Sequence, residues 1–231
     1  MSLRSLKRRL MRGIGLMPPK YKSFVSNAGD YDTLGRSQFD LLCFFGLKPD
    51  SYLLDIGCGS LNCGRFAIPM LAAGHYYGIE PERWLVEAGI RHELGNALYR
   101  SKRPVFDHDR DFKLNVFGRR FDFLIAHSII THTPQAQIRL LLDAANDVMA
   151  TDALFLATYG RGESDYAGDE WVYPGGVRYT PDRIHAIAAD AGLECTDVRW
   201  PHPRQSWVVF YRPGRAAFVE ERARAAAAAN R

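Results

Sequence analysis

Short apolar segments alternate with amphipathic segments along most of this chain, and the alternation restricts the fold more than any other feature. Five apolar segments have the length of a strand, namely SYLLDIG, HYYGIE, RPVFDHD, FDFLIAH and ALFLATYG. Segments with helical periodicity separate them. Strands that alternate with helices form a mostly parallel sheet with helices on both faces. The sequence therefore predicts a doubly wound α/β fold.

The last two apolar segments depart from this pattern. ECTDVRW and SWVVFYR are joined only by the link PHPRQ. A parallel connection needs a crossover of a dozen or more residues, so these two strands are predicted to pair antiparallel. The complete prediction is a mostly parallel seven-stranded sheet with a C-terminal antiparallel hairpin.

Threonine followed by proline precedes two of the helical segments. Thr133 and Pro134 come before QAQIRLLLDAANDVMA, and Thr180 and Pro181 begin TPDRIHAIAADAGL. Threonine is a favoured N-cap and proline fits the first helical position. Both helices are therefore predicted to begin with a threonine cap.

Length and charge set the domain organisation that we expect. With 231 residues, 47% of them hydrophobic, the chain can form one α/β domain. A net charge of +4 is too small to indicate nucleic-acid binding. Seven bases and no acid precede Asp30, and residues 1–14 have the pattern of a basic amphipathic helix suited to a membrane surface or a solvated terminus. We expect a basic helix and cap segment over 1–34, the main domain over 35–213 and a ragged tail over 214–231.

The four cysteines and the apolar runs indicate a compartment. No CxxC pair and no zinc-finger spacing occur among Cys43, Cys58, Cys63 and Cys195, so reduced thiols are expected. No apolar run approaches the length of a transmembrane helix. These features predict a cytoplasmic protein without a transmembrane segment. Whether it forms a homodimer is left open.

Two glycines and an acid mark the ends of the first two predicted strands. Gly57 and Gly59 would let a ligand approach the backbone closely where the first strand ends. Glu80 ends the second strand, where a carboxylate can accept both hydrogen bonds of a ribose diol. A ligand that contains adenosine is therefore predicted. A dinucleotide site would need a third glycine at position 62, where this chain has Asn62.

The motifs DIGCGS and GIEP, together with FDFLIAHSIITH, resemble the class I S-adenosylmethionine-dependent methyltransferases over residues 35–211. The resemblance implies a Rossmann-like fold and S-adenosylmethionine as cofactor, with S-adenosylhomocysteine as product. Many members have a third glycine where this chain has Leu61.

Cofactor contacts follow from the resemblance position by position. Asp55, Gly57 and Gly59 would line the methionine moiety, and Glu80 would hold the ribose. Pro81 and Trp84 would lie near the adenine, together with an acid after the third strand, for which Asp107, Asp109 and Asp111 compete and Asp109 is preferred. Ala126, His127 and Ser128 would lie close to the methyl group, and Arg36 would pair with the cofactor carboxylate.

The segment HSIITHTP supplies two candidate general bases for a hydroxyl acceptor, His127 and His132. A histidine with an ordinary pKa suits proton removal near neutral pH. His132 is preferred because it lies in the loop after the strand, although either histidine could instead be structural. The chain has AHSI in place of the N-P-P-Y type of motif, which disfavours methylation of adenine or glutamine nitrogen. Asp107, His108 and Asp109 could also hold a divalent metal such as magnesium.

Several aromatic residues precede the last helix, namely Tyr159, Tyr166, Trp171, Tyr173 and Tyr179. Aromatic faces among polar groups suit a saccharide or another small molecule. The motifs GRSQFDLL and YYGIEP also resemble bacterial methyltransferases that modify polysaccharides or glycosides. We therefore expect an O-methyltransferase for a saccharide or glycosylated small molecule. Two alternatives remain, a methyltransferase with another nitrogen, carbon or carboxylate acceptor and a cofactor-binding protein without turnover.

Overall fold

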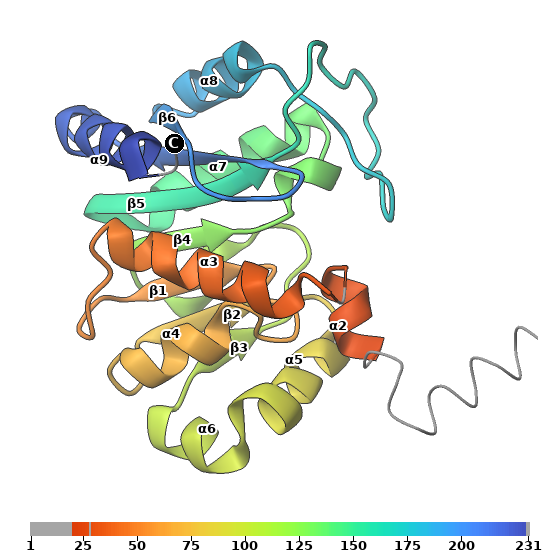
Figure 1. Ribbon diagram of the computed structural model, residues 1–231, viewed down its shortest axis with the longest axis vertical. Coiled ribbons are helices and arrows are strands. Elements are labelled where there is room, and N and C mark those ends of the chain that lie inside the picture. The colour runs from red at the N-terminus through yellow and green to blue at the C-terminus, as the bar shows by residue number, and fades with distance from the viewer. Residues whose placement is uncertain (1–19, 28, 230–231) are drawn as a thin grey trace, which may run out of the picture.

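The computed structural model describes residues 20–27 and 29–229. Seven strands form one sheet in the order β3-β2-β1-β4-β5-β7-β6 (Figure 1). The strands are β1 Leu53–Ile56, β2 Tyr76–Ile79, β3 Val105–Asp107, β4 Phe121–Ala126, β5 Met149–Tyr159, β6 Glu194–Val198 and β7 Ser206–Tyr211. The first five are parallel to one another, and β7 is antiparallel to both β5 and β6. The predicted sheet and its C-terminal hairpin are confirmed.

Helices connect the strands. They are α2 Lys20–Val25, α3 Tyr31–Phe44, α4 Gly64–Met70, α5 Arg83–Gly89, α6 Asn96–Lys102, α7 Gln135–Val148, α8 Pro181–Asp190 and α9 Ala216–Ala229. A π-helical turn over Ile90–Leu94 extends α5, and 3-10 turns span Leu114–Phe117 and Ile130–His132. The segment of residues 160–180 and α2 lie at the edge of the sheet where the parallel strands end (Figure 1).

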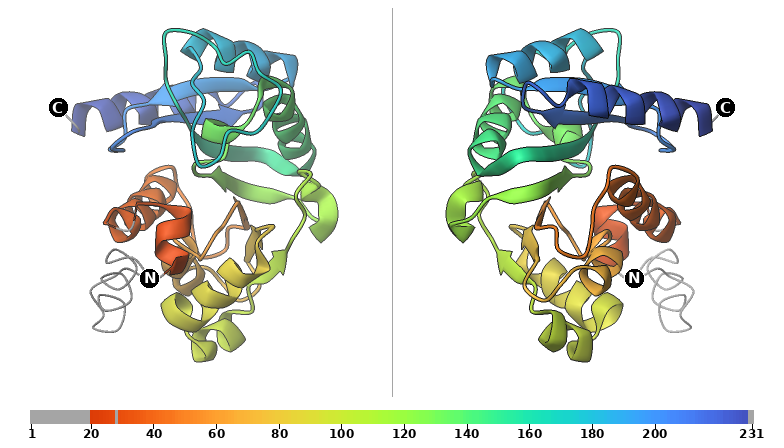
Figure 2. Two further views of the ribbon diagram at one scale, coloured as in Figure 1. Left: turned by 90° about the vertical axis from the view of Figure 1, so that its right-hand side faces the viewer. Right: turned by 90° about the vertical axis from the view of Figure 1, so that its left-hand side faces the viewer.

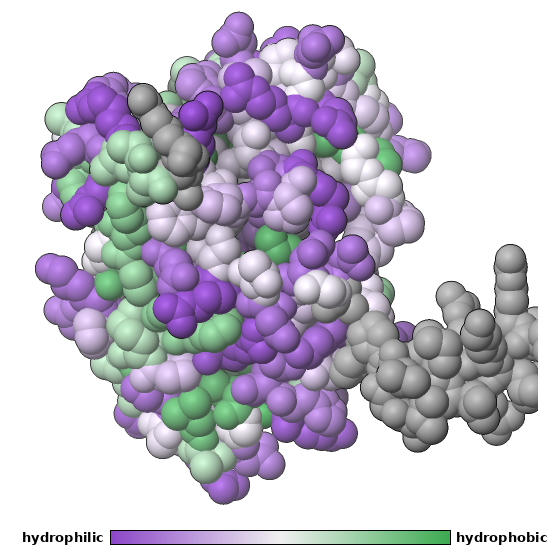
Figure 3. Space-filling view, viewed as in Figure 1, coloured by the Kyte–Doolittle hydropathy of each residue, from purple (hydrophilic) through white to green (hydrophobic). Residues whose placement is uncertain are grey.

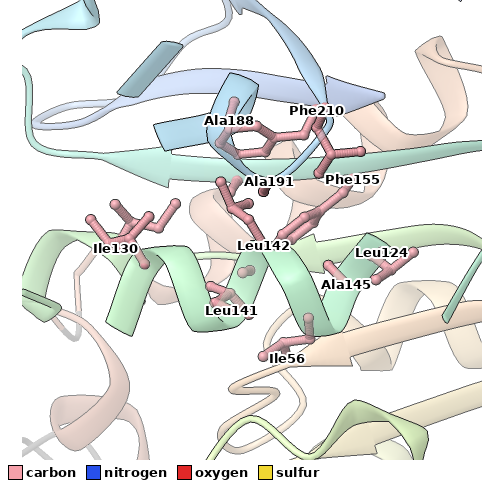
Figure 4. Packing of buried hydrophobic residues seen from close by; sticks show 14 of the residues in the cluster. Ile56, Leu124, Ile130, Leu141, Leu142, Ala145, Phe155, Ala188, Ala191 and Phe210 are labelled. Carbon is pink, nitrogen blue, oxygen red and sulfur yellow. The ribbon is translucent and has the colours of Figure 1, made fainter. Parts of the chain in front are cut away.

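The helices cover both faces of the sheet, as the side views in Figure 2 show. Alternate residues of each strand face opposite sides, so β4 buries Leu124 in one core cluster and Phe123 in the other. The first cluster packs the strands against α7 and α8, and the second against α3, α4, α5 and α9. Figure 4 shows Leu141, Leu142 and Ala145 of α7 lying next to strand residues of the first cluster.

The structure changes two expectations about the ends of the main domain. The expected ragged tail instead contains α9, which packs against β6 with Val219 and Ala226 fully buried. Apart from Phe218 and Val219, α9 contains only alanines and charged residues, so no apolar stripe showed in the sequence. The expected boundary at residue 34 falls inside α3, which continues the same body. The basic helix predicted over 1–14 lies outside the described residues.

Of the two predicted threonine caps, one is confirmed and one is wrong. Thr180 caps α8 as predicted, because its hydroxyl accepts a hydrogen bond from the backbone N–H of Arg183 at 3.2 Å. The cap predicted at Thr133 is wrong. Pro134 stands at the start of α7 without a side-chain cap, and the Thr133 hydroxyl donates to the carbonyl of Ile129 at 2.7 Å. Thr133 thus stabilises the turn before the helix.

The face of the molecule seen in Figure 3 is hydrophilic around α2 and α5, and hydrophobic residues gather over α4 and α6. Within residues 20–27 and 29–229, none of the helices combines the length and the apolar composition that a membrane span requires.

Candidate ligand-binding and catalytic site

The turn after β1 has a backbone path that requires glycine. Gly57 and Gly59 have φ angles of +72° and +54°. A Cβ atom on Gly57 would lie 2.3 Å from Cδ1 of Ile129, and one on Gly59 would lie 2.8 Å from Cγ1 of Val25. Leu61 takes a φ of +63°, at a cost of about 1–2 kcal/mol. The turn therefore keeps its left-handed path without the third glycine.

Glu80 joins the ends of β1 and β2. Its Oε2 accepts a hydrogen bond from the N–H of Gly59 at 3.0 Å, and its Oε1 accepts one from the N–H of Glu82 at 2.9 Å. The side chain is buried, and this burial raises the pKa of the carboxyl, opposed by the two backbone hydrogen bonds. A carboxylate has about four acceptor positions. Glu80 therefore retains acceptor capacity after both of these bonds are made.

Asp55 lies beneath the glycine turn, within the fold. Its Oδ2 accepts a hydrogen bond from the hydroxyl of Tyr76 at 2.6 Å. The pKa of Asp55 is raised to about 7, because burial raises it, the hydrogen bond from Tyr76 lowers it in part and the nearby Glu80 also raises it. The structure thus places Asp55 behind the turn formed by the two glycines. Its predicted contact with a ligand amine stays a prediction.

A cavity of about 280 Å³ opens beside the glycine turn. Three predicted cofactor residues line it, Gly57, Pro81 and Asp109. Phe112, Ile129 and Trp171 complete much of the wall, and the rings of Phe112 and Trp171 stack with centroids 6.2 Å apart. Phe112 was missed, although it follows the acids 107–111 directly. Trp171 was assigned to the acceptor pocket and instead lines this cavity.

The structure does not bring Trp84 and Arg36 to this cavity. The Trp84 ring packs edge-on against Phe24 of α2, with centroids 5.3 Å apart, and its Nε1–H donates to Glu82 at 3.0 Å. Arg36 pairs with Asp40 of its own helix at 2.8 Å. Both side chains have protein partners in place of the predicted ligand contacts.

The acids after β3 organise their own loop. Oδ1 of Asp109 accepts hydrogen bonds from the N–H groups of Asp111 and Lys113, both at 2.8 Å. Oδ1 of Asp107 accepts one from the N–H of Asp109, and Nδ1 of His108 donates to the carbonyl of Glu80 at 2.6 Å. Within the part of the chain that the structure describes, no three His, Cys, Asp or Glu side chains are grouped to hold a metal ion. The metal site considered at residues 107–109 is therefore not formed by these side chains.

His127 and His202 face each other at the ends of β4 and the β6–β7 link. Their Nε2 atoms are 3.0 Å apart. Nδ1 of His202 accepts hydrogen bonds from the N–H groups of Arg204 and Gln205, so His202 carries its proton on Nε2 and donates it to His127. Desolvation, then His202 and Arg204, lower the pKa of His127 to about 3. A group with this pKa is a weak general base at neutral pH.

This histidine pair has a consequence for acid stability. Desolvation also lowers the pKa of His202, to about 4. In the unfolded chain both histidines become protonated as the pH falls below about 6.5, whereas in the folded protein both rings are still neutral there. The unfolded chain then binds more protons, and stability falls as the pH drops below about 6.5. We expect the His202→Gln variant to lose less thermal stability than the wild type between about pH 7 and pH 4.5. Equal losses in a thermal unfolding series would contradict this assignment.

Ala126 and Ser128 stand on either side of His127. Ala126 is fully buried at the end of β4. Ser128 has a φ of +60°, and its N–H donates to the hydroxyl of Thr158 at 2.8 Å. Its Oγ accepts a hydrogen bond from Nε2 of Gln205 at 2.7 Å. These contacts tie the end of β4 to β5 and the β6–β7 link.

His132 is oriented by the segment of residues 160–180. Its Nδ1 lies 3.0 Å from the carbonyl oxygen of Val172 and 2.6 Å from that of Gly175. Two carbonyl acceptors fix the proton on Nδ1, so the lone pair is on Nε2. The ring of Tyr173 stands edge-on to the imidazole at 5.3 Å, and its hydroxyl donates to the carbonyl of Phe24. The turn therefore directs Nδ1 to the backbone and leaves Nε2 as the nitrogen that a hydroxyl could reach.

A second cavity of about 310 Å³ lies beside His132. Thr131 and His132 line this cavity, whereas Ile129 of the same segment lines the first. The segment 171–176 likewise places Trp171 at the first cavity and residues 174–176 at the second. Two of the aromatics expected here, Tyr159 and Tyr179, are instead fully buried in the core. The two cavities thus lie on either side of the same pair of segments.

The fold matches solved structures of methyltransferases, whereas no family model matches the sequence. Magnesium protoporphyrin IX methyltransferase from Synechocystis PCC 6803, solved with bound SAM, has 14% identity and a TM-score of 0.61, over 80% of this chain and 81% of that one. The sugar N-methyltransferase KedS8 from Streptoalloteichus sp. ATCC 53650 has 15% identity and a TM-score of 0.60, over 85% and 94%. The mitomycin 7-O-methyltransferase MmcR has 14% identity and a TM-score of 0.59, over 80% of this chain and 54% of that one. This chain therefore has the fold of S-adenosylmethionine-dependent methyltransferases.

Proposed function

We propose that this protein is an S-adenosylmethionine-dependent O-methyltransferase that acts on a saccharide or glycosylated small molecule, with His132 as the general base. The observation that carries the proposal is the orientation of His132. Its proton is fixed on Nδ1 by two backbone carbonyls, and its ring lines a cavity beside the end of β4. The resemblance of DIGCGS and GIEP to methyltransferase motifs supports the choice of cofactor.

The first cavity suits the adenosine part of this cofactor. Glu80 lies at the end of β2 with acceptor capacity for ribose hydroxyls, and Phe112 with Trp171 offers aromatic surface. The space over Gly57 and Gly59 is filled by the side chains of Ile129 and Val25. A ligand that approaches the two glycines must displace these side chains, both of which end in movable methyl groups.

The residues around the second cavity supply the chemistry of the acceptor. S-adenosylmethionine, when bound, supplies an electrophilic methyl group on a sulfonium. His132 would take the proton of the acceptor hydroxyl at Nε2. The exposed ring of Tyr173, which stands edge-on to the imidazole of His132, gives an apolar face against which a sugar can pack. His127 is left out of the base role because its pKa is too low.

Calorimetric titration tests the cofactor first. We expect S-adenosylhomocysteine to bind at micromolar concentration and NAD, the control, not to bind. Methyl transfer from labelled S-adenosylmethionine to a saccharide panel then tests the reaction, read as a mass increase of one methylene. Failure of S-adenosylhomocysteine to bind contradicts the proposal, and binding without transfer to any acceptor supports a cofactor-binding protein.

A further inference from the structure

We infer that the acceptor carries an anionic group, a carboxylate or a phosphate, which Arg178 and Arg204 hold in the cavity beside His132. This inference rests on the proposed function, because it names the class of acceptor for the same site. Arg178 comes from the segment before α8, and Arg204 comes from the β6–β7 link, so two different elements each contribute an arginine to the lining of the cavity.

The charge of the cavity wall is the first argument. Arg178, Arg204 and His132 line the cavity, and its wall contains no aspartate or glutamate. Nη1 of Arg178 donates to the carbonyl of Arg161 at 2.9 Å, and within the described residues no carboxylate forms an ion pair with it. Arg204 pairs through Nη1 with Asp30 at 3.1 Å, which leaves further N–H donors of its guanidinium. Two cations around one cavity repel each other unless an anion lies between them.

A buried hydroxyl in the same wall is the second argument. Thr131 is only 5% exposed, and its Oγ1 is buried without a hydrogen-bond partner among the described residues. Buried hydroxyl groups in folded proteins normally have a partner, because an unmade hydrogen bond is costly. Since Thr131 also lines the cavity, rotation of its side chain about the Cα–Cβ bond would bring the hydroxyl to a ligand oxygen bound there. The main chain of Thr131 is fixed, because its carbonyl accepts from Val177 at 2.7 Å.

The two arginines suit an acceptor with anionic oxygens better than a neutral sugar. Arginine presents a planar fork of N–H donors that fits a carboxylate or phosphate in two parallel hydrogen bonds. Glycines at 175 and 176 put no side chain between this wall and His132. An anion held by the arginines would fix the acceptor and leave a neighbouring hydroxyl within reach of the imidazole.

Binding to the full-length protein loaded with S-adenosylhomocysteine tests this inference. The probes are glucuronate, glucose 6-phosphate and glucose, titrated by calorimetry. We expect one charged sugar to bind at least about tenfold more tightly than glucose. A tenfold change in affinity corresponds to about 1.4 kcal/mol, and a single hydrogen bond to a charged group contributes at least that much. Whether glucuronate or glucose 6-phosphate binds identifies the anion.

Three variants locate the contact. Arg178→Gln is expected to remove the preference for the charged sugar. Thr131→Val keeps the shape of the side chain, so affinity should fall several-fold while the melting temperature stays the same or rises. Arg139→Gln, a surface arginine of α7 paired with Asp143, is the matched control and should leave affinity unchanged.

These experiments test the anionic acceptor independently of the proposed methyl transfer. Equal binding of glucose and both charged sugars, no binding of either charged sugar, or full affinity in Arg178→Gln would overturn the inference. Methyl transfer is measured on the same three sugars. If methyl is transferred to glucose alone, the proposed function is supported and the anionic acceptor is ruled out. If a charged sugar binds selectively but is not methylated, the anion site is supported and the proposed reaction on that sugar is not.

Discussion

Replacing His132 with asparagine is expected to lower methyl-transfer turnover by about 10²–10⁴-fold, the usual contribution of a positioned general base. The asparagine amide nitrogen occupies nearly the position of Nδ1. It can therefore keep the hydrogen bonds to the carbonyls of Val172 and Gly175 while Nε2 is lost. Steady-state rates at saturating cofactor measure the change, and calorimetry with S-adenosylhomocysteine should give an unchanged dissociation constant.

The His132→Gln variant is the control for this experiment. Glutamine places its amide near the position of Nε2 and lacks the donor at Nδ1, so the turn loses its ties to residues 172 and 175. A structural role predicts that the asparagine variant stays active while the glutamine variant does not. An asparagine variant with the rate of the wild type would therefore rule out His132 as the base.

Replacing Glu80 with alanine is expected to weaken S-adenosylhomocysteine binding by about 10–100-fold. Hydrogen bonds to a charged group contribute about 1.5–3 kcal/mol, and each 1.4 kcal/mol is about a factor of ten in affinity. The substitution also removes the acceptor for the N–H groups of Gly59 and Glu82, so the glycine turn keeps only its backbone hydrogen bonds to Ile79 of β2. Calorimetry measures the dissociation constant, and thermal unfolding measures how far the substitution destabilises the fold.

The Glu80→Gln variant separates these two effects. Its side-chain oxygen can still accept from Gly59 at the position of Oε2, while the second acceptor oxygen becomes a donor. Because the amide nitrogen then faces the N–H of Glu82, we expect both the thermal stability and the affinity to lie between those of the wild type and the alanine variant. An unchanged dissociation constant in both variants would sink the assignment of Glu80 to the ribose.

The sequence predicted the positions of those site residues that are placed by the backbone alone. Gly57 and Gly59 end β1, Glu80 ends β2, and Ala126 ends β4, all along one edge of the sheet. Parallel neighbouring strands place their carboxyl ends together, so a pattern of strand ends is enough to bring these residues near one another. The positive φ angles at both glycines were also foreseeable, since glycine is the residue that adopts them without cost.

Other features of the site depend on side-chain packing between distant segments. Trp84, which follows GIEP, packs against Phe24 of α2, and Phe112 and Trp171 line the cavity beside the glycine turn. The two histidines of HSIITHTP looked alike in sequence. His202, 75 positions away, turns His127 into a neutral hydrogen-bonded ring, while two carbonyls of the segment 160–180 orient His132.

The sequence by itself determined the succession of strands and helices, the mostly parallel sheet and the antiparallel pairing of the last two strands, because strand periodicity and the length of each connection are local properties of the chain. It also determined the glycine turn and the acid after β2. Only the tertiary structure decided which histidine keeps an available nitrogen, which aromatic rings line the cavity, and that Arg178 and Arg204 meet beside Thr131. Each of these outcomes depends on contacts between segments far apart in sequence, and no local pattern encodes such contacts.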